Sequence, residues 1–106
     1  MKEGNVTAFV VGSTASITTT EFEPGLRRDI PESLERIAPQ GIRYHDDDTW
    51  RDGNGHSHVR AALMGCSITI PFMNGKMLLG TWQQIVVIDH DNRPRRRTIV
   101  VQMIGK

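Results

Sequence analysis

Apolar and polar residues alternate loosely over residues 5–20, where valine, phenylalanine, isoleucine and threonine dominate. Branched and aromatic side chains of this kind suit the pleated surface of a β-strand. Gly12 interrupts the run, which indicates either two strands that separate there or a bulge. The chain is therefore expected to begin with strands.

The next segment of the chain has the hydrophobic period of a helix. Apolar residues recur at spacings of four, four and three from Leu26 to Ile37, as on one face of an amphipathic helix. Pro31 lies inside this stripe, so the helix either kinks there or restarts with Pro31 in its first turn. Pro39 and Gly41 are expected to end it.

Residues 40–55 form a polar loop rich in aspartate and glycine, in which Trp50 is the one large apolar residue. A short helix is predicted from His56 to Met64, ending at Gly65. Cys66 to Phe72 is then predicted as a strand.

Asn74-Gly75 suits a type I′ hairpin, because both central positions of that turn need positive φ. Residues 77–79 and 83–88 are expected to continue the sheet, and residues 97–104 form the last strand. The pattern predicts a single α+β domain over residues 1–106. Its core is a mainly antiparallel sheet or sandwich, with one main helix and one short helix, and the later strands form a meander.

The amino-acid composition argues against several classes of protein. The 13 Lys and Arg balance the 12 Asp and Glu, so nothing points to nucleic acid or an anionic membrane surface. The single Cys66 cannot form an internal disulfide, which fits a reducing compartment. We find no apolar run of about 18 residues and no signal-peptide core at residues 1–9, so a cytoplasmic location is expected.

Three of the four histidines, His45, His56 and His58, fall within fourteen residues, next to Asp46–Asp48, and the fourth, His90, stands apart in a turn-like stretch. Imidazoles and carboxylates together are typical of proton-transfer and metal sites. If His56 and His58 begin a helix, their side chains point about 200° apart and do not face one ligand. A closed zinc site is therefore not expected. An open metal site with water, and solvated loop histidines, both remain possible.

Acidic residues flank the first predicted helix. Glu23 is expected to complement the positive helix N-terminus. Glu21, at the end of a strand, is a candidate for an inward-facing carboxylate, and Asp29 lies in the helix itself. For Asp46–Asp48 the simplest interpretation is a solvated loop neutralised by the flanking arginines at positions 43 and 51.

The run RPRRR at 93–97 is the one dense positive patch. In a strand, Arg95 and Arg97 share a face and are candidates to bind a phosphate; a charged hairpin end is the alternative. Within LLGTWQQ at 78–84, Trp82 suits an interface, a pocket wall or simply a core. Thr81 and Gln83 would share the opposite face of a regular strand.

These segments together resemble the YjbQ family, whose members are labelled secondary thiamine-phosphate synthases. The resemblance covers almost the whole chain and lies in GSTASITTTEFEPGLRRDI at 12–30, YHDD at 44–47, NGHSHVRAALMG at 54–65, ITIPFMNGKMLLGTWQ at 68–83 and RRRTIVVQMIG at 95–105. It implies a compact α+β domain that assembles as a homotrimer, with a pocket near the subunit boundary.

The resemblance also implies site residues. Glu21, Asp29, His45 and His58 fall on family motif positions, as do Thr81, Trp82 and Gln83. In a thiamine-phosphate synthase-like transferase, the two histidines would exchange protons with substrate, and the two acids would orient them. Arg95 and Arg97 would hold the phosphate, and His45 and His58 are also candidate ligands of a divalent metal ion.

Two departures from the family pattern stand out. Gly12-Ser13-Thr14 replaces a His-Thr-Thr or His-Thr-Ser motif, so one expected ring nitrogen is missing. The chain also begins just before the Val6–Val11 strand, whereas members usually carry a further strand-forming segment ahead of it.

Three functions are open at this point. The first is an enzyme acting on a small phosphorylated substrate, with secondary thiamine-phosphate synthase activity. The second is a metal-dependent hydrolase that uses the same histidine and aspartate residues. The third is a non-catalytic trimeric module that binds an anionic metabolite.

Overall fold

The computed structural model describes residues 1–106. The elements are, in chain order, β1 (Glu3–Val11), β2 (Ala15–Thr20), α1 (Leu26–Ile37), α2 (His45–Trp50), α3 (Gly55–Met64), β3 (Ser67–Met73), β4 (Lys76–Met77), β5 (Gln84–Asp89) and β6 (Thr98–Gly105).

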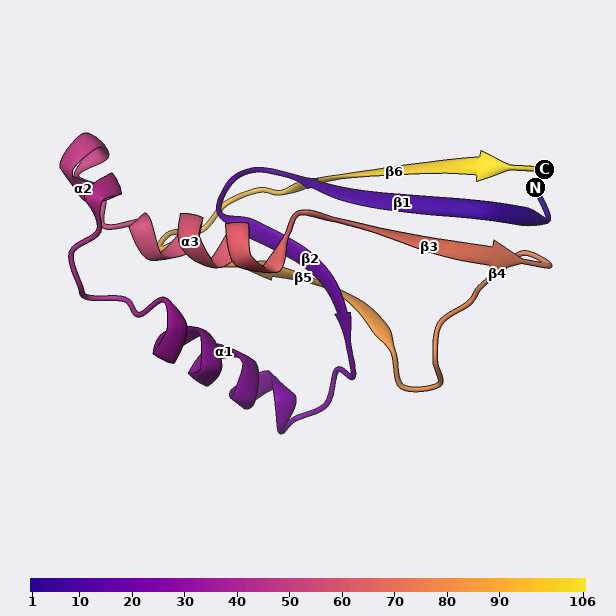
Figure 1. Cartoon of the computed structure of the whole chain (residues 1–106), viewed down its shortest axis with the longest axis horizontal. Helices are drawn as coiled ribbons and strands as arrows, with labels where there is room; N and C mark the ends of the chain where they lie inside the picture. The colour runs from indigo at the N-terminus through magenta and orange to yellow at the C-terminus, as the bar shows by residue number, and fades with distance from the viewer.

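Two antiparallel sheets make up the strand layer. One has four strands in the order β4-β3-β1-β6, and the other pairs β2 with β5. Figure 1 shows β1, β3 and β6 reaching away from the helices to the end of the molecule where both termini lie. The predicted α+β class with a mainly antiparallel sheet is confirmed.

The helices were also compared with the length and apolar character that a membrane span needs, and none of them meets both requirements.

The break at Gly12 and the Asn74-Gly75 hairpin are both confirmed. β1 ends at Val11 and β2 begins at Ala15, so Gly12 separates two strands. Asn74 has φ 54° and Gly75 φ 74°, as a type I′ turn requires. The hairpin joins β3 to β4, which is shorter than predicted.

The predicted meander is wrong. β5 does not continue the sheet of β3 and β4 but pairs with β2, from Ala15 opposite Asp89 to Thr20 opposite Gln84. β6 pairs with β1 instead of β5. Strand patterning identifies a strand and its faces but not its partner, because strands pair through backbone N–H and C=O groups that every strand offers.

Helix α1 runs without interruption through Pro31, and its Leu34 is buried. Its N-terminus is held as expected for Glu23, whose carboxylate accepts hydrogen bonds from the backbone N–H groups of Gly25 and Leu26. α3 also matches its prediction within one residue.

Helix α2 lies where a loop was expected. All three residues Asp46–Asp48 fall in its first turn, where negative charge complements the helix dipole. The Asp47 carboxylate accepts a hydrogen bond from the Tyr44 N–H at 3.1 Å. The Tyr44 hydroxyl donates to the Pro39 carbonyl at 2.7 Å. A cluster of aspartates that looks like a solvated loop is therefore the start of a helix.

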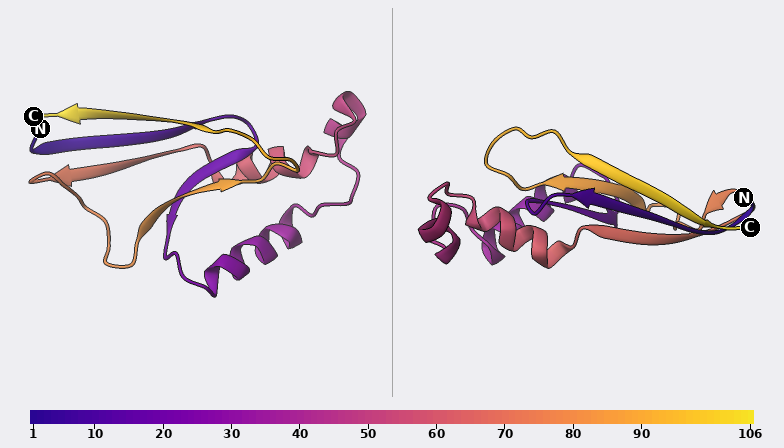
Figure 2. Two further views of the ribbon diagram at one scale, coloured as in Figure 1. Left: turned by 180° about the vertical axis from the view of Figure 1, so that it is seen from behind. Right: turned by 90° about the horizontal axis from the view of Figure 1, so that it is seen from above.

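The core is small. Ala8 and Val10 of β1 pack against Ala15 and Ile17 of β2. Cys66, Ile68 and Ile85 add partly buried contacts at its edge. Figure 2 shows how this leaves the long strands on one side of the molecule and the helices on the other.

Gly55 is required by close packing. It is buried, and a Cβ atom added there would overlap the side chain of Tyr44. We expect Gly55→Ala to lower the free energy of unfolding by about 1–3 kcal/mol, since α3 must move away from Tyr44. Urea denaturation measures this. Gly80→Ala is the control, because a Cβ atom there would meet its nearest neighbour at 3.6 Å, and an equal loss in both variants would contradict this interpretation.

Candidate functional site

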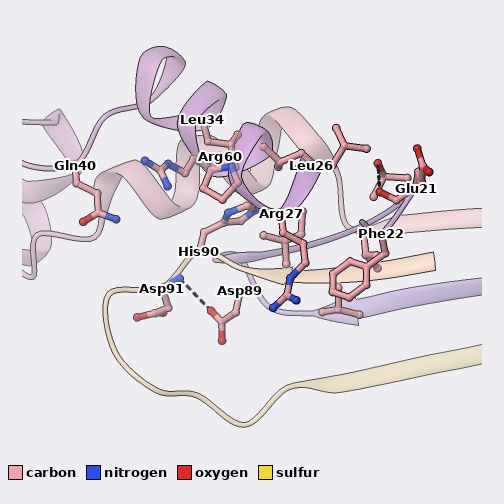
Figure 3. A pocket seen from close by; sticks show the side chains of 16 residues that line it. Glu21, Phe22, Leu26, Arg27, Leu34, Gln40, Arg60, Asp89, His90 and Asp91 are labelled. Carbon is pink, nitrogen blue, oxygen red and sulfur yellow. Dashed lines mark hydrogen bonds between the residues drawn. The ribbon is translucent and has the colours of Figure 1, made fainter. Parts of the chain in front are cut away.

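A cavity of about 380 Å³ lies between α1 and the end of β5. Its apolar wall includes Leu26, Ile30 and Leu34 of α1. Figure 3 shows the opposite wall, where His90 lies near Arg60. This volume is within the range of small-molecule sites, which typically measure about 300–1,000 Å³.

His90 is held at the cavity by both backbone and side chain. It follows β5 directly, and its N–H donates to the Thr14 carbonyl at 2.9 Å, which extends the pairing with β2. The residue is buried, and its Nε2 lies 2.9 Å from the hydroxyl of Ser16, which is also buried. Sequence position alone placed His90 apart from the other histidines, whereas the fold makes it the imidazole of the cavity.

His90 is neutral over most of the accessible pH range. Burial lowers the pKa of its imidazole to about 4, and the positive charge of Arg60 adds to this effect. Asp89 acts in the opposite direction but is too weak to restore the ordinary value. The cavity wall therefore carries an uncharged ring that can donate or accept one hydrogen bond.

Asp91 lies next to His90 and is ionised. Its side chain has no exposed surface, and burial alone would raise its pKa. Hydrogen bonds from Thr14 (2.9 Å), Asn54 (3.2 Å) and Arg95 (2.8 Å) outweigh burial and hold the pKa well below its usual range.

Arg97 pairs with the neighbouring Asp89 at 2.7 Å, and a hydrogen bond from this guanidinium lowers the pKa of Asp89. The same Nη2 lies 2.7 Å from the Thr14 hydroxyl. A Cβ atom at Gly12 would meet Arg97 Nη1 at 2.8 Å, so the guanidinium fills the space that a side chain at position 12 would use. Arg95 and Arg97 thus bind carboxylates of their own chain.

Two other arginines line the cavity. Arg27 forms no ion pair, and its guanidinium carbon lies 5.1 Å from the centre of the Phe22 ring. Arg60 is buried, with Nε donating to the Ala38 carbonyl and Nη2 to Glu35. Neither arginine has a sequence pattern that marks it as a ligand-binding residue, because charged residues are ordinary on helices.

A buried polar network supports the cavity wall from behind. The hydroxyl of Ser57 contacts the Asn54 side chain, the His90 carbonyl and His56 Nε2. Asn54 accepts a hydrogen bond from the Asn92 N–H and donates to Asp91, which fixes the orientation of its amide. His56 is therefore part of the interior packing of α3 and lies away from solvent.

The predicted site residues are distributed over several parts of the molecule. Glu21 lines the cavity, as Figure 3 shows. Asp29 is exposed on α1 and does not line it. His45 is exposed at the start of α2, and His58 is half-buried on α3; neither contributes to the cavity wall within one chain. Catalysis by these two histidines stays a prediction.

The Thr81–Gln83 segment lies in the connection between β4 and β5, and all three residues are exposed, Trp82 by 72%. Gln83 accepts a hydrogen bond from Gly80 N–H at 3.0 Å and donates to Thr19 at 2.9 Å. It therefore fastens this connection to β2. A direct contact of these residues with substrate stays a prediction.

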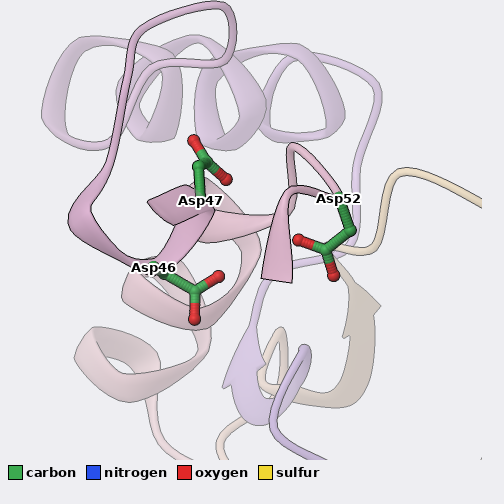
Figure 4. A group of neighbouring side chains, drawn as sticks. All are labelled: Asp46, Asp47 and Asp52. Carbon is green, nitrogen blue, oxygen red and sulfur yellow. The ribbon is translucent and has the colours of Figure 1, made fainter. Parts of the chain in front are cut away.

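Asp46, Asp47 and Asp52 form the one group of three side chains that could hold a cation, with ligand oxygens within 4.8 Å of one another (Figure 4). The group lies on α2 and just after it. His45 and His58, the predicted metal ligands, do not belong to it. Carboxylate oxygens alone favour Mg²⁺ or Ca²⁺ over zinc, but exposed aspartates often cluster without an ion.

The whole chain, residues 1–106, matches the family described as UPF0047 protein YjbQ-like. The chain belongs to the YjbQ family. Its relatives include a UPF0047 protein of Archaeoglobus fulgidus, 35% identical over 97% of this chain and 79% of the relative. A UPF0047 protein of Methanothermobacter thermautotrophicus is 40% identical over all of this chain and 72% of the relative.

Solved structures of YjbQ-family proteins show the same fold. The YugU orthologue of Clostridium acetobutylicum superposes with a TM-score of 0.86 at 35% identity, covering 98% of this chain and 78% of that one. A hypothetical protein of Aeropyrum pernix superposes with a TM-score of 0.90 at 31% identity, covering 99% of this chain and 76% of that one.

His90 makes stability depend on pH. Between about pH 4 and 6.5 the unfolded chain binds a proton at this residue and the folded chain does not, so the free energy of unfolding falls as pH falls. From pH 7 to pH 5 we expect a loss of about 2 kcal/mol from this group. Urea denaturation at both pH values measures it.

The control is His90→Gln, whose amide can reach Ser16 but does not titrate. Between pH 7 and pH 5 the free energy of unfolding of this variant should therefore fall by about 2 kcal/mol less than that of the wild type. Asp89 and Asp91, with lowered pKa values, stabilise the fold above their ordinary value of 3.8 and lose that effect only at lower pH, outside this window. Equal slopes in both proteins would show that His90 titrates normally.

Proposed function

We propose that this YjbQ-family protein is an enzyme that acts on a small phosphorylated substrate in the cavity between α1 and β5. One observation carries the proposal: a neutral buried imidazole and an arginine without an ion pair line the same cavity. The finer proposal is a secondary thiamine-phosphate synthase activity, as in the label of the family.

Arg27 is the proposed phosphate anchor. Arg95 and Arg97 are less suitable than their sequence suggested, because their guanidinium groups bind the carboxylates of Asp91 and Asp89. Arg27 has no such partner and lies at the cavity. Guanidinium forks suit phosphate oxygens, and a charged hydrogen bond contributes about 1.5–3 kcal/mol.

In the transfer step, negative charge develops on the leaving pyrophosphate. The thiazole phosphate attacks the methylene carbon of the aminopyrimidine diphosphate, and pyrophosphate leaves with the electron pair of the broken C–O bond. Fixed positive groups such as Arg27 and Arg60 would stabilise that charge. Glu21 would orient the substrate or a catalytic group from the rim of the cavity. The carboxylate cluster on α2 and just after it does not line the cavity, so it would not hold a divalent ion beside the pyrophosphate.

The activity is tested by complementation of a thiamine-requiring strain. Wild type and Arg28→Ala should support growth, and Arg27→Ala should not, because Arg28 is exposed and does not line the cavity. Calorimetry with pyrophosphate gives a second readout, in which Arg27→Ala should weaken binding by about 10-fold or more. Growth with neither wild type nor control would refute the thiamine activity.

The remaining outcomes separate the alternatives. Pyrophosphate binding without growth would favour a non-catalytic module for an anionic metabolite. One divalent metal ion per purified chain, lost in His45→Ala and His58→Ala, would favour a metal-dependent hydrolase instead.

We also propose that the functional form is a homotrimer, in which β6 contacts another subunit. Ile99, Val101 and Met103 lie opposite Val10, Ala8 and Val6 of β1, so they extend the apolar core face, yet all three are exposed. The radius of gyration is 16.0 Å, against about 13 Å for a compact domain of 100 residues. A single chain therefore leaves part of its core face uncovered.

Val101→Asp should dissociate the assembly, because it places a charge in the proposed contact. Sedimentation should give about three times 11.9 kDa for wild type and 11.9 kDa for the variant. Gln102→Asp is the control, since position 102 faces the other side of the sheet and should leave the mass unchanged. A monomeric wild type would refute the trimer.

A further inference from the structure

The hydrogen bond between Ser16 and His90 determines more than the position of the ring. Ser16 has no exposed surface, and its one side-chain partner is His90 Nε2, at 2.9 Å. A buried hydroxyl has one proton to donate, and leaving it unpaired costs about 1–3 kcal/mol. Its proton therefore has one available acceptor, the imidazole nitrogen.

Nε2 can accept that proton only as the unprotonated nitrogen of a neutral ring. The ring proton is then on Nδ1. If Nε2 carried the proton instead, it would donate to Ser16, and the serine hydroxyl would have no acceptor in the interior.

We infer that Ser16 holds His90 in the Nδ1–H tautomer, so that the cavity presents a neutral hydrogen-bond donor. Nδ1 has no partner within the chain, and it is not among the polar atoms that are sealed off from the surface. His90 lines the cavity, so this N–H is available to a ligand there (Figure 3). Ser16 is a positioning residue, which acts through His90.

The surrounding charges keep the ring neutral. Arg60 and His56 approach it from α3, Arg97 from the segment before β6, and Asp89 from β5. Burial is the largest effect, and together with the arginines it outweighs the opposing charge of Asp89. His90 is therefore suited to donate a hydrogen bond and poorly suited to remove a proton.

The tautomer also indicates which ligands the cavity can bind, an inference that rests on the proposed function. An N–H donor near Arg27 and Arg60 favours a group that offers acceptor oxygens, such as a phosphoryl or carboxylate oxygen. A protonated amine placed against it would leave two donors facing each other, because an ammonium group has no acceptor.

Nitrogen NMR of histidine in the ligand-free protein tests the assignment at neutral pH. We expect His90 to show a protonated Nδ1 and an unprotonated Nε2. In Ser16→Ala this preference should disappear, and the ring should shift toward the Nε2–H form that free imidazole side chains favour in water. Ser13→Ala is the matched control, because Ser13 is exposed and forms no hydrogen bond with the ring.

A protonated Nε2 in the wild type would overturn the inference, whatever the variants do. If Ser16→Ala does not fold, the wild-type spectrum still decides. Addition of pyrophosphate then tests the ligand: the His90 Nδ1–H signal should move downfield. An Nδ1–H ring whose signal does not respond would support the tautomer and count against the proposed function, so the two fail separately.

Discussion

The buried carboxylate of Asp91 joins the parts of the molecule that form the cavity. An ionised group without exposed surface must be fully paired, because an unpaired buried charge costs several kcal/mol. Its partners come from three segments: Thr14 from the turn before β2, Asn54 from the start of α3, and Arg95 from the segment before β6. Displacing any one of them would remove a hydrogen bond from this buried charge.

This constraint positions the neighbouring His90. The backbone of His90 is fixed by Thr14, and its carbonyl lies against Ser57 of α3. The imidazole is thereby pressed into the interior beside Ser16 while its residue still lines the cavity. A polar network with nearly every group satisfied is rigid, and a rigid wall is what orientation of a small ligand requires.

A single chain completes the polar network around Asp91, but it leaves the strands partly uncovered. The core cluster of Ala8, Val10, Ala15 and Ile17 covers only the inner part of the four-stranded sheet. The outer strand β6 is exposed along its full length. The molecule therefore combines a rigid polar network near the helices with uncovered apolar surface on β6.

Local patterns in the sequence predicted much of the secondary structure. The apolar stripe of α1, the break at Gly12 and the turn at Asn74-Gly75 depend on neighbours in the chain, so they could be read directly. Helix α2 was missed because a run of aspartates is equally common in a loop, and only the hydrogen bond between Asp47 and Tyr44 shows that a helix begins there.

The candidate site was predictable in part. Glu21 was expected at a pocket and lines the cavity, whereas His90 was set aside because no other histidine is near it in sequence. Its partner Ser16 is 74 residues away and had no distinguishing pattern. Arg27 likewise lacked a signal, since arginines on a helix are ordinarily solvated.

The sequence by itself determined where α1, α3 and most strands begin and end, the apolar faces they carry and the family to which the chain is similar. The tertiary structure alone decided which strands pair, which arginines remain free of ion pairs and which histidines are buried. The physical reason is that periodicity and turn chemistry act over a few residues, whereas pairing, burial and pKa depend on groups that meet only when the chain is folded.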